Sequence, residues 1–477
     1  MNNKYRSLAK DTALFAISNF GSKILLFLLT PLYTAVLTTK DYGIADLINT
    51  TILFVYPVLT LAIADATLRF ALDENESKSE VMCCSILFTM ISALALILLY
   101  PCGKFIDTEL SEYFNYFVIT YILFNINNCF ANFIKGIGKT SLFALQGILQ
   151  TLAIVISNIL LLVIFKVGLR GYLISIIIGY IVPVIVVFFA GKLYNYIFPF
   201  RLSKRIVAEM LKYSIPMIPT LLAWSINSSI DKYMITGIVG ISENGLYSAA
   251  HKIPTIVTTL LSIFLQAWQI SAISNYKSDD ESEYYTEIYK ALDLISVVAC
   301  TGLILCTKWI ASLLFAKKFY DAWKFVPFLI LAAVFSSNSG FLAAAYRAAK
   351  KTASLFISVC VGAVVNIVLN YALLKKTGTI GAAIATAVSF FFVWLVRIIL
   401  VQKIVKIKIN PLKTAFTYLL LITICVIYTL DISYAFIICL ILGISLVLIN
   451  IKGIIRITSK LFEVTLNFIF KRHKGAT

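Results

Sequence analysis

Long apolar stretches dominate the chain, and short polar segments separate them. Each stretch runs for about 20 residues, the length an α-helix needs to cross roughly 30 Å of hydrocarbon. The stretches do not alternate apolar with polar residues, so they predict helices and not the strands of a barrel. We expect an all-α integral membrane protein with about 14 transmembrane helices. Their expected ranges are 11–37, 43–70, 81–102, 113–134, 141–165, 171–191, 211–238, 245–272, 287–310, 324–346, 352–374, 379–401, 412–430 and 433–451.

The first twelve expected helices form two related halves. The segment 135–158 recurs as 347–370, and a weaker echo relates residues 41–43 to 243–245. Repeats in parallel orientation give two bundles related by an axis along the membrane normal. We therefore expect two six-helix bundles with pseudo-two-fold symmetry and two extra C-terminal helices. The expected domains are an N-terminal bundle at 1–200, a C-terminal bundle at 201–408, two additional transmembrane helices at 409–452 and a basic amphipathic cytoplasmic tail at 453–477.

The chain carries a net charge of +18, although only 13% of its residues are charged. Its basic residues lie mostly in short loops on one side, as the positive-inside rule describes, so they do not indicate a nucleic-acid partner. This distribution places the N-terminus in the cytoplasm, and an even number of helices returns the C-terminus to the same side. The tail from Lys452 onward mixes basic and apolar residues and is expected to lie on the membrane surface.

Motifs for hydrolysis, redox chemistry or metal binding are absent from the sequence. The nine cysteines lie in or at the ends of apolar stretches without a CxxC or Cys/His cluster. The segment Gly138-Lys139-Thr140 resembles the end of a Walker A motif, but Phe133 stands where its first glycine belongs. We therefore expect a protein that is not an enzyme and that holds neither metal nor cofactor.

Prolines fall inside four expected helices that correspond between the two halves. They are Pro31 and Pro57 in the first half and Pro216, Pro219 and Pro254 in the second. Proline removes a backbone donor and bends a helix. These helices are expected to bend, unless the prolines only shape packing.

Placing an ionisable side chain at the depth of the bilayer costs about 2.5–3.5 kcal/mol, so we expect each such residue to have a functional or structural role. Lys23 lies in the middle of the first expected helix, one turn from Asn19. Asp231 and Lys232 are adjacent, so they point about 100° apart on a helix, and one of them is expected to pair with another helix. The helix 245–272 carries a polar stripe from His251 to Gln269, which indicates contact with water. The first, second, seventh and eighth helices are expected to line a wet, positively charged cavity.

Some of these residues also fit purely structural roles. Asp65 and Arg69 are spaced to neutralise each other on one helix. Lys135 and Arg347 lie at the inner ends of helices, where long basic side chains reach the headgroups. His251 fits a buried core residue as well as a proton carrier. The expected pairing of Asp231 or Lys232 with another helix also fits a purely structural bridge.

Both hairpins with proline resemble a known family. The first half carries TPLYTAVLT at 30–38, DYGIADL at 41–47 and ATLRF at 66–70, and the second carries DKYMI at 231–235 and GLYS at 245–248. These segments resemble bacterial polysaccharide repeat-unit flippases of the multidrug/oligosaccharidyl-lipid/polysaccharide exporter superfamily. The resemblance extends over about residues 8–405 in character.

The resemblance implies a flippase in the bacterial cytoplasmic (inner) membrane. Such proteins move an undecaprenyl-diphosphate-linked oligosaccharide to the outer leaflet by alternating access, for O-antigen, capsule or a related glycan. The implied partners are membrane lipid, a coupling ion (proton or sodium), and the polysaccharide polymerase and glycosyltransferases. A cationic, amide-rich cavity open to lipid suits a polar headgroup on an apolar tail.

The resemblance implies roles for individual polar residues. Those expected to bind the diphosphate are Lys23, Arg69, Lys232 and Lys252, and those expected to bind sugars are Asn19, Asn227, Trp224, Gln266 and Gln269. Asp65, Asp231 and His251 are expected to carry the coupling ion or switch charge, and Lys135 and Arg347 to form a cytoplasmic gate.

Three other functions compete with this interpretation. A lipid II flippase for peptidoglycan synthesis would also have fourteen helices and a cationic cavity. A multidrug/cation antiporter of the same superfamily usually has about twelve helices and an acidic cavity, unlike the basic residues here. A membrane-embedded glycosyltransferase or polymerase would need long catalytic loops, which this chain lacks.

Overall fold

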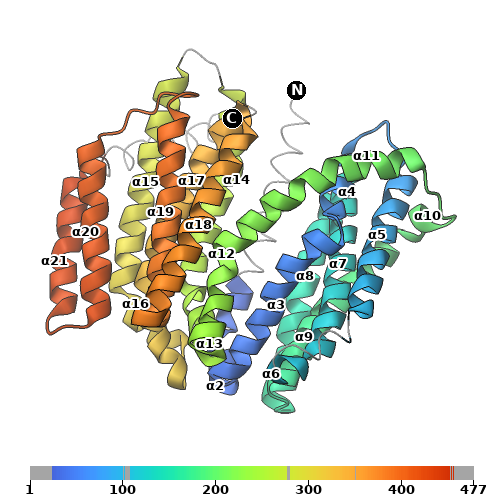
Figure 1. Ribbon diagram of the computed structural model, residues 1–477, viewed down its shortest axis with the longest axis horizontal. Helices are drawn as coiled ribbons and strands as arrows, with labels where there is room; N and C mark the ends of the chain where they lie inside the picture. Colours follow the sequence, from blue (N-terminus) through green and yellow to red (C-terminus); the bar gives the residue numbers. More distant parts are fainter. Residues whose placement is uncertain are drawn as a thin grey trace, which may run out of the picture. The chain divides into compact units, whose positions relative to one another are not determined.

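The computed structural model describes residues 24–99, 101, 108–276, 280–349, 351–451, 453 and 455, and their regular structure is helical throughout (Figure 1). Within these ranges, 11 helices are long and apolar enough to cross a membrane, or up to 12 if a bent pair meeting near residue 251 is one span. The all-α membrane fold is confirmed, whereas a count of fourteen is not. Residues 11–23, about half of the first expected helix, lie outside the described residues, and Ile24–Val36 and Ala435–Ile451 are shorter apolar helices.

The contacts between helices divide the chain into two compact units. The first unit comprises Met1–Lys252 and Leu314–Phe319, and the second comprises Ile253–Leu313 and Tyr320–Thr477. This grouping by contact is distinct from the repeat, so the domain boundaries expected from the sequence remain a prediction.

The first unit contains helices from both expected halves of the repeat. They are α2 (Thr30–Val36), α3 (Thr39–Leu59), α4 (Ile63–Leu72), α5 (Lys78–Leu98), α6 (Thr108–Ser111), α7 (Phe114–Gly136), α8 (Thr140–Asn158), η2 (Ile159–Ile164), α9 (Leu169–Ala190), α10 (Tyr194–Ile197), α11 (Lys204–Ser214), η3 (Ile215–Met217), α12 (Ile218–Ile238) and α13 (Ile241–Ala250).

Two apolar clusters hold the first unit together, and α7 contributes to both. In one cluster, Met82 of α5 and Phe133 of α7 are fully buried with Ile206 of α11. In the other, Tyr121 of α7 packs with residues of α3 and α9, among them Ile48. In a membrane, close van der Waals packing holds such clusters together, because the surrounding lipid is as apolar as the core. The clusters therefore fix α3, α4 and α11 against a common helix.

Breaks near prolines interrupt three of the helices expected to bend. α3 contains Pro57 and ends two residues later, and Leu61 and Ala62 then take positive φ angles of 53° and 52° before α4 begins. A 3₁₀ turn, η3, contains Pro216 and joins α11 to α12. The third break separates α13 from α14 just before Pro254. The predicted bend is confirmed at the third break, where the two helices meet at 42°, and bending at the other prolines stays a prediction.

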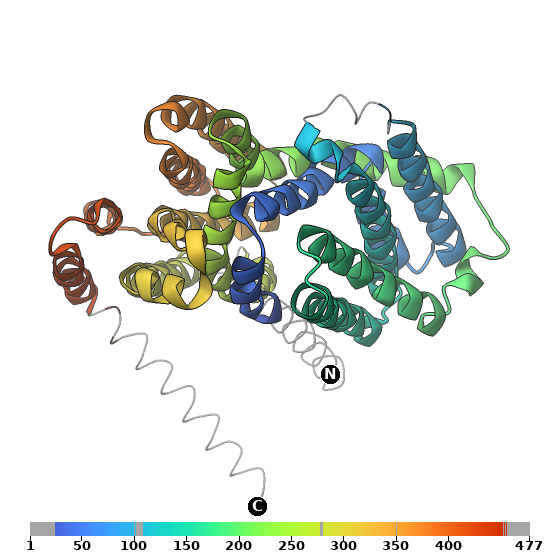
Figure 2. The ribbon, with the colours of Figure 1, turned by 90° about the horizontal axis from the view of Figure 1, so that it is seen from below.

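The second unit is organised around α17. Its helices are α14 (Lys252–Ser274), α15 (Glu281–Leu305), α16 (Thr307–Leu314), η4 (Lys317–Lys324), α17 (Val326–Ala348), α18 (Thr352–Thr377), α19 (Thr379–Val401), α20 (Pro411–Leu430) and α21 (Ala435–Ile449), except that Leu314–Phe319, with the start of η4, belongs to the first unit. Nearly all of α17 is buried, because α15, α18, α19 and α20 pack around it. The final pair, α20 and α21, lies side by side and packs on α15 (Figure 2).

Candidate functional site

The helices α3 and α13 cross so closely that two glycines are required at the crossing. A Cβ atom on Gly43 would overlap the carbonyl oxygen of Ile241, and one on Gly245 would overlap that of Thr39. Gly43 contacts Ile241, four residues before Gly245, and Gly245 contacts Thr39, four residues before Gly43. The crossing is therefore symmetric. Asn244 donates a hydrogen bond from Nδ2 to the carbonyl of Gly43 at 3.2 Å. The two segments that echo each other in the sequence are therefore direct partners.

Beyond this crossing, Lys232 of α12 forms an ion pair with Asp46 of α3. The Nζ–Oδ1 distance is 2.9 Å, and the side chains are 15% and 20% exposed. Lys232 also donates to Thr50 Oγ1 at 3.4 Å. The second carboxylate oxygen of Asp46, Oδ2, is buried and has no hydrogen bond among the described residues. The pair joins two helices, but half of its carboxylate is left unsatisfied.

The neighbouring residue, Asp231, points to a different helix. It is buried, and the hydroxyl of Tyr247 in α13 donates to its Oδ2. Its Oδ1 accepts a hydrogen bond from the backbone N–H of Lys232 at 3.0 Å. The predictions that adjacent Asp231 and Lys232 diverge, and that one of them pairs with another helix, are both confirmed.

His251 lies at the break that follows α13, near Asp46 and in contact with Tyr247. Its ring meets that of Tyr247 edge to face, with the centroids 4.7 Å apart. The charges of Lys232, Asp46 and Lys252 all act on His251. We call Asp46, Asp231, Lys232, His251 and Lys252 the junction cluster. It brings together four site residues predicted from the sequence and adds Asp46.

Other predicted site residues of the first unit lie around α12 or outside the described part. Asn227 is buried one turn before Asp231, and Trp224 is half-exposed on the same helix. Lys23 and Asn19, which were predicted to bind diphosphate and sugar, lie outside the described residues.

Asp65 and Arg69 do not form the ion pair that their spacing allows. Arg69 instead approaches Asp73 of the following loop, with 3.8 Å between Nη1 and Oδ2 and 57% of its side chain exposed. Asp65 is half-buried in the first turn of α4 and has no ion pair among the described residues. Asp65 and Arg69 therefore have different environments.

The two predicted gate residues make different contacts. Lys135 lies over the ring of Phe143, 5.6 Å from its centroid. In the second unit, Arg347 donates a hydrogen bond to Gln269 at 2.7 Å. Gln266 is exposed on α14, one turn before Gln269. The structure thus brings together one predicted gate residue and one predicted sugar ligand.

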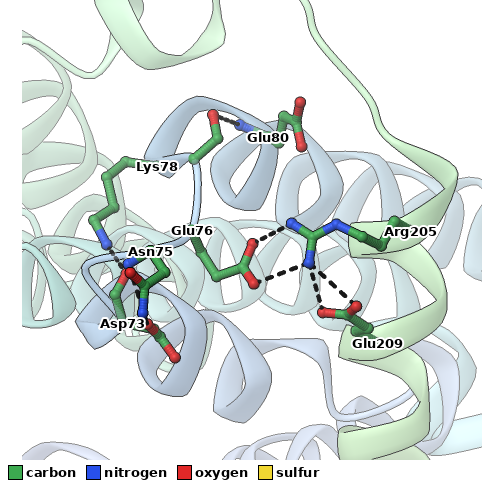
Figure 3. Close-up of polar contacts among 8 residues, drawn as sticks. Asp73, Asn75, Glu76, Lys78, Glu80, Arg205 and Glu209 are labelled. Atoms are coloured by element: carbon green, nitrogen blue, oxygen red, sulfur yellow. Dashed lines mark hydrogen bonds and ion pairs between the residues drawn. The ribbon is translucent and has the colours of Figure 1, made fainter.

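Arg205 of α11 binds the polar loop that follows α4 (Figure 3). Arg205 donates to both carboxylate oxygens of Glu76, at 2.6 and 3.1 Å, and also to Glu209 at 3.2 Å. This contact holds the start of α11 beside the loop and occupies the guanidinium of Arg205 with two carboxylates.

Two polar groups in the second unit were not recognised from the sequence. Arg397 of α19 is buried and donates to Ser358 Oγ at 2.9 Å and to the Ser339 carbonyl at 2.8 Å. Asp293 of α15 accepts hydrogen bonds from Asn338 and Tyr418. Both charges interrupt apolar runs, and this signal could have identified them.

The family of polysaccharide biosynthesis proteins matches residues 8–269, which is more than half of the chain. The chain belongs to this family. Its matched region contains all the residues of the junction cluster. No curated protein sequence matches the chain closely enough to be reported as a relative.

Solved structures of transporters share the fold of this family member. A lipid II flippase MurJ in an inward closed conformation aligns with a TM-score of 0.70 and 19% identity, covering 93% of this chain and 99% of MurJ. An inward-facing multidrug resistance transporter of the MATE family, in the MOP superfamily, aligns with a TM-score of 0.67 and 13% identity, covering 82% and 98%. A MOP superfamily transporter from Pyrococcus furiosus aligns with a TM-score of 0.60 and 13% identity, covering 83% and 96%. At these identities the similarity establishes the fold.

Proposed function

We propose that this protein flips an undecaprenyl-diphosphate-linked oligosaccharide from the cytoplasmic to the outer leaflet of the bacterial inner membrane, for assembly of a surface polysaccharide such as O-antigen or capsule. Membership of the polysaccharide biosynthesis family supports the pathway. The observation that best supports the mechanism is the Lys232–Asp46 pair. Lys232 is a cation within the helices, and its only ion-pair partner in the described part of the chain is the carboxylate of Asp46.

The diphosphate of the substrate competes with Asp46 for Lys232 in this mechanism. A phosphate binds an ammonium through charge-assisted hydrogen bonds, as a carboxylate does, and it carries more charge. Once displaced, Asp46 has both oxygens free and takes a proton or sodium ion from the coupling gradient. Asp231 and His251 border the same pair and share this charge switch, and Asp65 is a further candidate for it.

The remaining predicted residues keep their roles in the proposal. Lys23, Arg69 and Lys252 add positive charge for the diphosphate, while Asn19, Asn227, Trp224, Gln266 and Gln269 contact sugars. Lys135 and Arg347 act at the cytoplasmic gate. The polymerase and glycosyltransferases of the pathway are the proposed protein partners.

A lipid II flippase for peptidoglycan is the second candidate. It is favoured by the similarity to MurJ, which extends over nearly the full length of both chains. The two candidates share a diphosphate headgroup and differ in the glycan. Depleting the protein from cells separates them, because loss of surface glycan supports the first function and arrest of peptidoglycan synthesis supports the second.

The test is a cell strain whose surface glycan depends on this protein. Lys232→Ala and Lys23→Ala should each lower the glycan at least about tenfold at normal protein level, because each removes a positive charge proposed to bind the diphosphate. Lys204→Ala, at the exposed start of α11, is the matched control and should leave the glycan unchanged. Normal glycan in both variants would overturn the proposal. In vesicles, transport should collapse with the proton or the sodium gradient, and indifference to both would exclude ion coupling.

A further inference from the structure

The second unit contains a cavity of about 280 Å³ at the end where α15 and α20 begin and α21 ends. Polar side chains of three kinds line it. They are an acid, Asp293, two lysines, Lys290 and Lys413, and neutral groups that include Asn410, Thr417 and Asn450. The cavity lies outside the junction cluster and has no role in the proposed transport mechanism.

Asp293 is held in place at the inner side of this cavity. Its Oδ1 accepts hydrogen bonds from the hydroxyl of Tyr418 and from Nδ2 of Asn338, each at 2.6 Å. Asn338 also donates to the Tyr418 hydroxyl at 2.9 Å, so the three groups fix one another. The other carboxylate oxygen, Oδ2, makes no hydrogen bond to any described residue. A fixed carboxylate with one unused oxygen beside a cavity is suited to bind a donor or cation.

Lys290 and Lys413 lie at the outer side of the cavity. Both are exposed, and neither forms an ion pair within the described ranges. The side chain of Asn410 caps α20 by accepting a hydrogen bond from the Lys413 N–H at 3.1 Å. The start of this 20-residue helix adds further positive potential. The outer side is therefore suited to bind an anion.

The position of these groups along α15 fits the boundary between headgroups and acyl chains. The first turns of the helix are acidic up to Glu287, and Lys290 and Asp293 follow about 4.5 and 9 Å further along the axis. Leu294, next to Asp293, and Val297, one turn further along, give the cavity an apolar side. A ligand here would have a charged headgroup and an apolar continuation.

We propose that this cavity binds the phosphoethanolamine headgroup of a membrane lipid. A simple anion would face Asp293, and a simple cation would face the two lysines. A zwitterion satisfies both, with its phosphate on Lys290 and Lys413 and its ammonium on Oδ2 of Asp293. A primary ammonium donates hydrogen bonds to the carboxylate, which the trimethylated headgroup of a choline lipid cannot do. The site is independent of the transported substrate.

The test uses the purified full chain in detergent, with added phosphatidylethanolamine, phosphatidylglycerol, phosphatidylcholine or free phosphoethanolamine. Ligand that binds only the folded protein raises its melting temperature. Phosphatidylethanolamine should raise it by at least about 3 °C more than either other lipid does. A rise with free phosphoethanolamine as well shows that the headgroup suffices, and a rise with the lipid alone shows that the acyl chains are also needed. Equal rises with all three lipids, or none, would overturn the site.

Substitutions test which residues bind the phosphate and which bind the ammonium of the headgroup. The double variant Lys290→Gln/Lys413→Gln should abolish the response to phosphatidylethanolamine, whereas Lys376→Gln, an exposed lysine of α18 away from the cavity, should retain it. Asp293→Asn should remove the preference for phosphatidylethanolamine over phosphatidylglycerol. The preference is measured within each variant, so a lower starting melting temperature does not obscure it. An unchanged preference in Asp293→Asn, or an unchanged response in the double lysine variant, would contradict the proposal.

Discussion

Lys232 in the first unit and Arg397 in the second are both cations largely withdrawn from solvent, but their partners differ. Arg397 bonds to a serine hydroxyl and a backbone carbonyl, and its own carbonyl accepts from Tyr346 at 2.7 Å. These partners are neutral and belong to the packed core. Lys232 instead faces the carboxylate of Asp46, whose second oxygen is unsatisfied. An anionic ligand can replace a carboxylate partner, whereas it cannot enter the core around Arg397. This difference supports the proposed binding role of Lys232 and a structural role for Arg397.

The largest effect is expected at the helix crossing that supports Lys232. Gly245→Leu would drive a side chain into the backbone of Thr39, and neither helix backbone can yield without losing its contacts. We expect a loss of more than about 4 kcal/mol in folding stability, seen as failure to purify folded protein. Gly237→Ala in α12 is the control, because nothing lies within 4 Å of the added carbon. A normal melting temperature for Gly245→Leu would show that the crossing is not tightly packed.

Removing the structural cation should have the next largest effect. Arg397→Met would leave the Ser339 carbonyl and the Ser358 hydroxyl without their buried donor, at a cost of about 3 kcal/mol. Thermal unfolding of the purified protein measures it. Lys376→Met, at an exposed position of α18, should change stability by less than about 0.5 kcal/mol. If Arg397→Met were equally harmless, the contrast between the two cations would fail.

Replacing the Lys232–Asp46 pair as a unit should cost little. Lys232→Met alone leaves a partly buried carboxylate uncompensated and should destabilise by about 3 kcal/mol, whereas adding Asp46→Leu should restore stability to within about 1 kcal/mol. The same thermal measurement compares the single and double variants. A double variant that is less stable than the single one would mean that the pair is needed for folding.

The smallest effect is expected at the exposed arginine of α11. Arg205→Ala removes the bonds to Glu76 and Glu209, but 57% of the arginine side chain is exposed. Surface ion pairs contribute little to stability and weaken with salt, so we expect almost no change in the melting temperature of the purified protein. A large fall in melting temperature that is insensitive to salt would show that this contact supports the fold in the way Arg397 does.

The apolar pattern predicted the helices well, because each stretch must satisfy its backbone hydrogen bonds within itself. Helices lie within or overlap the described parts of the expected ranges, and the breaks near Pro57, Pro216 and Pro254 were predicted. The exact number of transmembrane spans was not predicted, because length and composition do not show whether short helices such as Ala435–Ile451 cross the membrane.

The site was only partly predictable because pairing depends on contacts distant in sequence. The divergence of Asp231 and Lys232 followed from helix geometry, but the partner of Lys232, 186 positions away, did not. The spacing of Asp65 and Arg69 favoured a pair that is absent, because Arg69 turns toward Asp73. Arg397 and Asp293 were overlooked, although a single charge within an apolar run is the same signal that identified Lys23.

The central claim is that Lys232 recognises the diphosphate and that its pairing with Asp46 is exchangeable. The most direct measurement is the flipping rate of an undecaprenyl-diphosphate-linked oligosaccharide in vesicles that contain the Lys232→Met/Asp46→Leu variant. We predict a folded protein whose flipping rate falls at least about tenfold, the kinetic equivalent of 1.4 kcal/mol. Flipping at the rate of the unmodified protein would contradict the account.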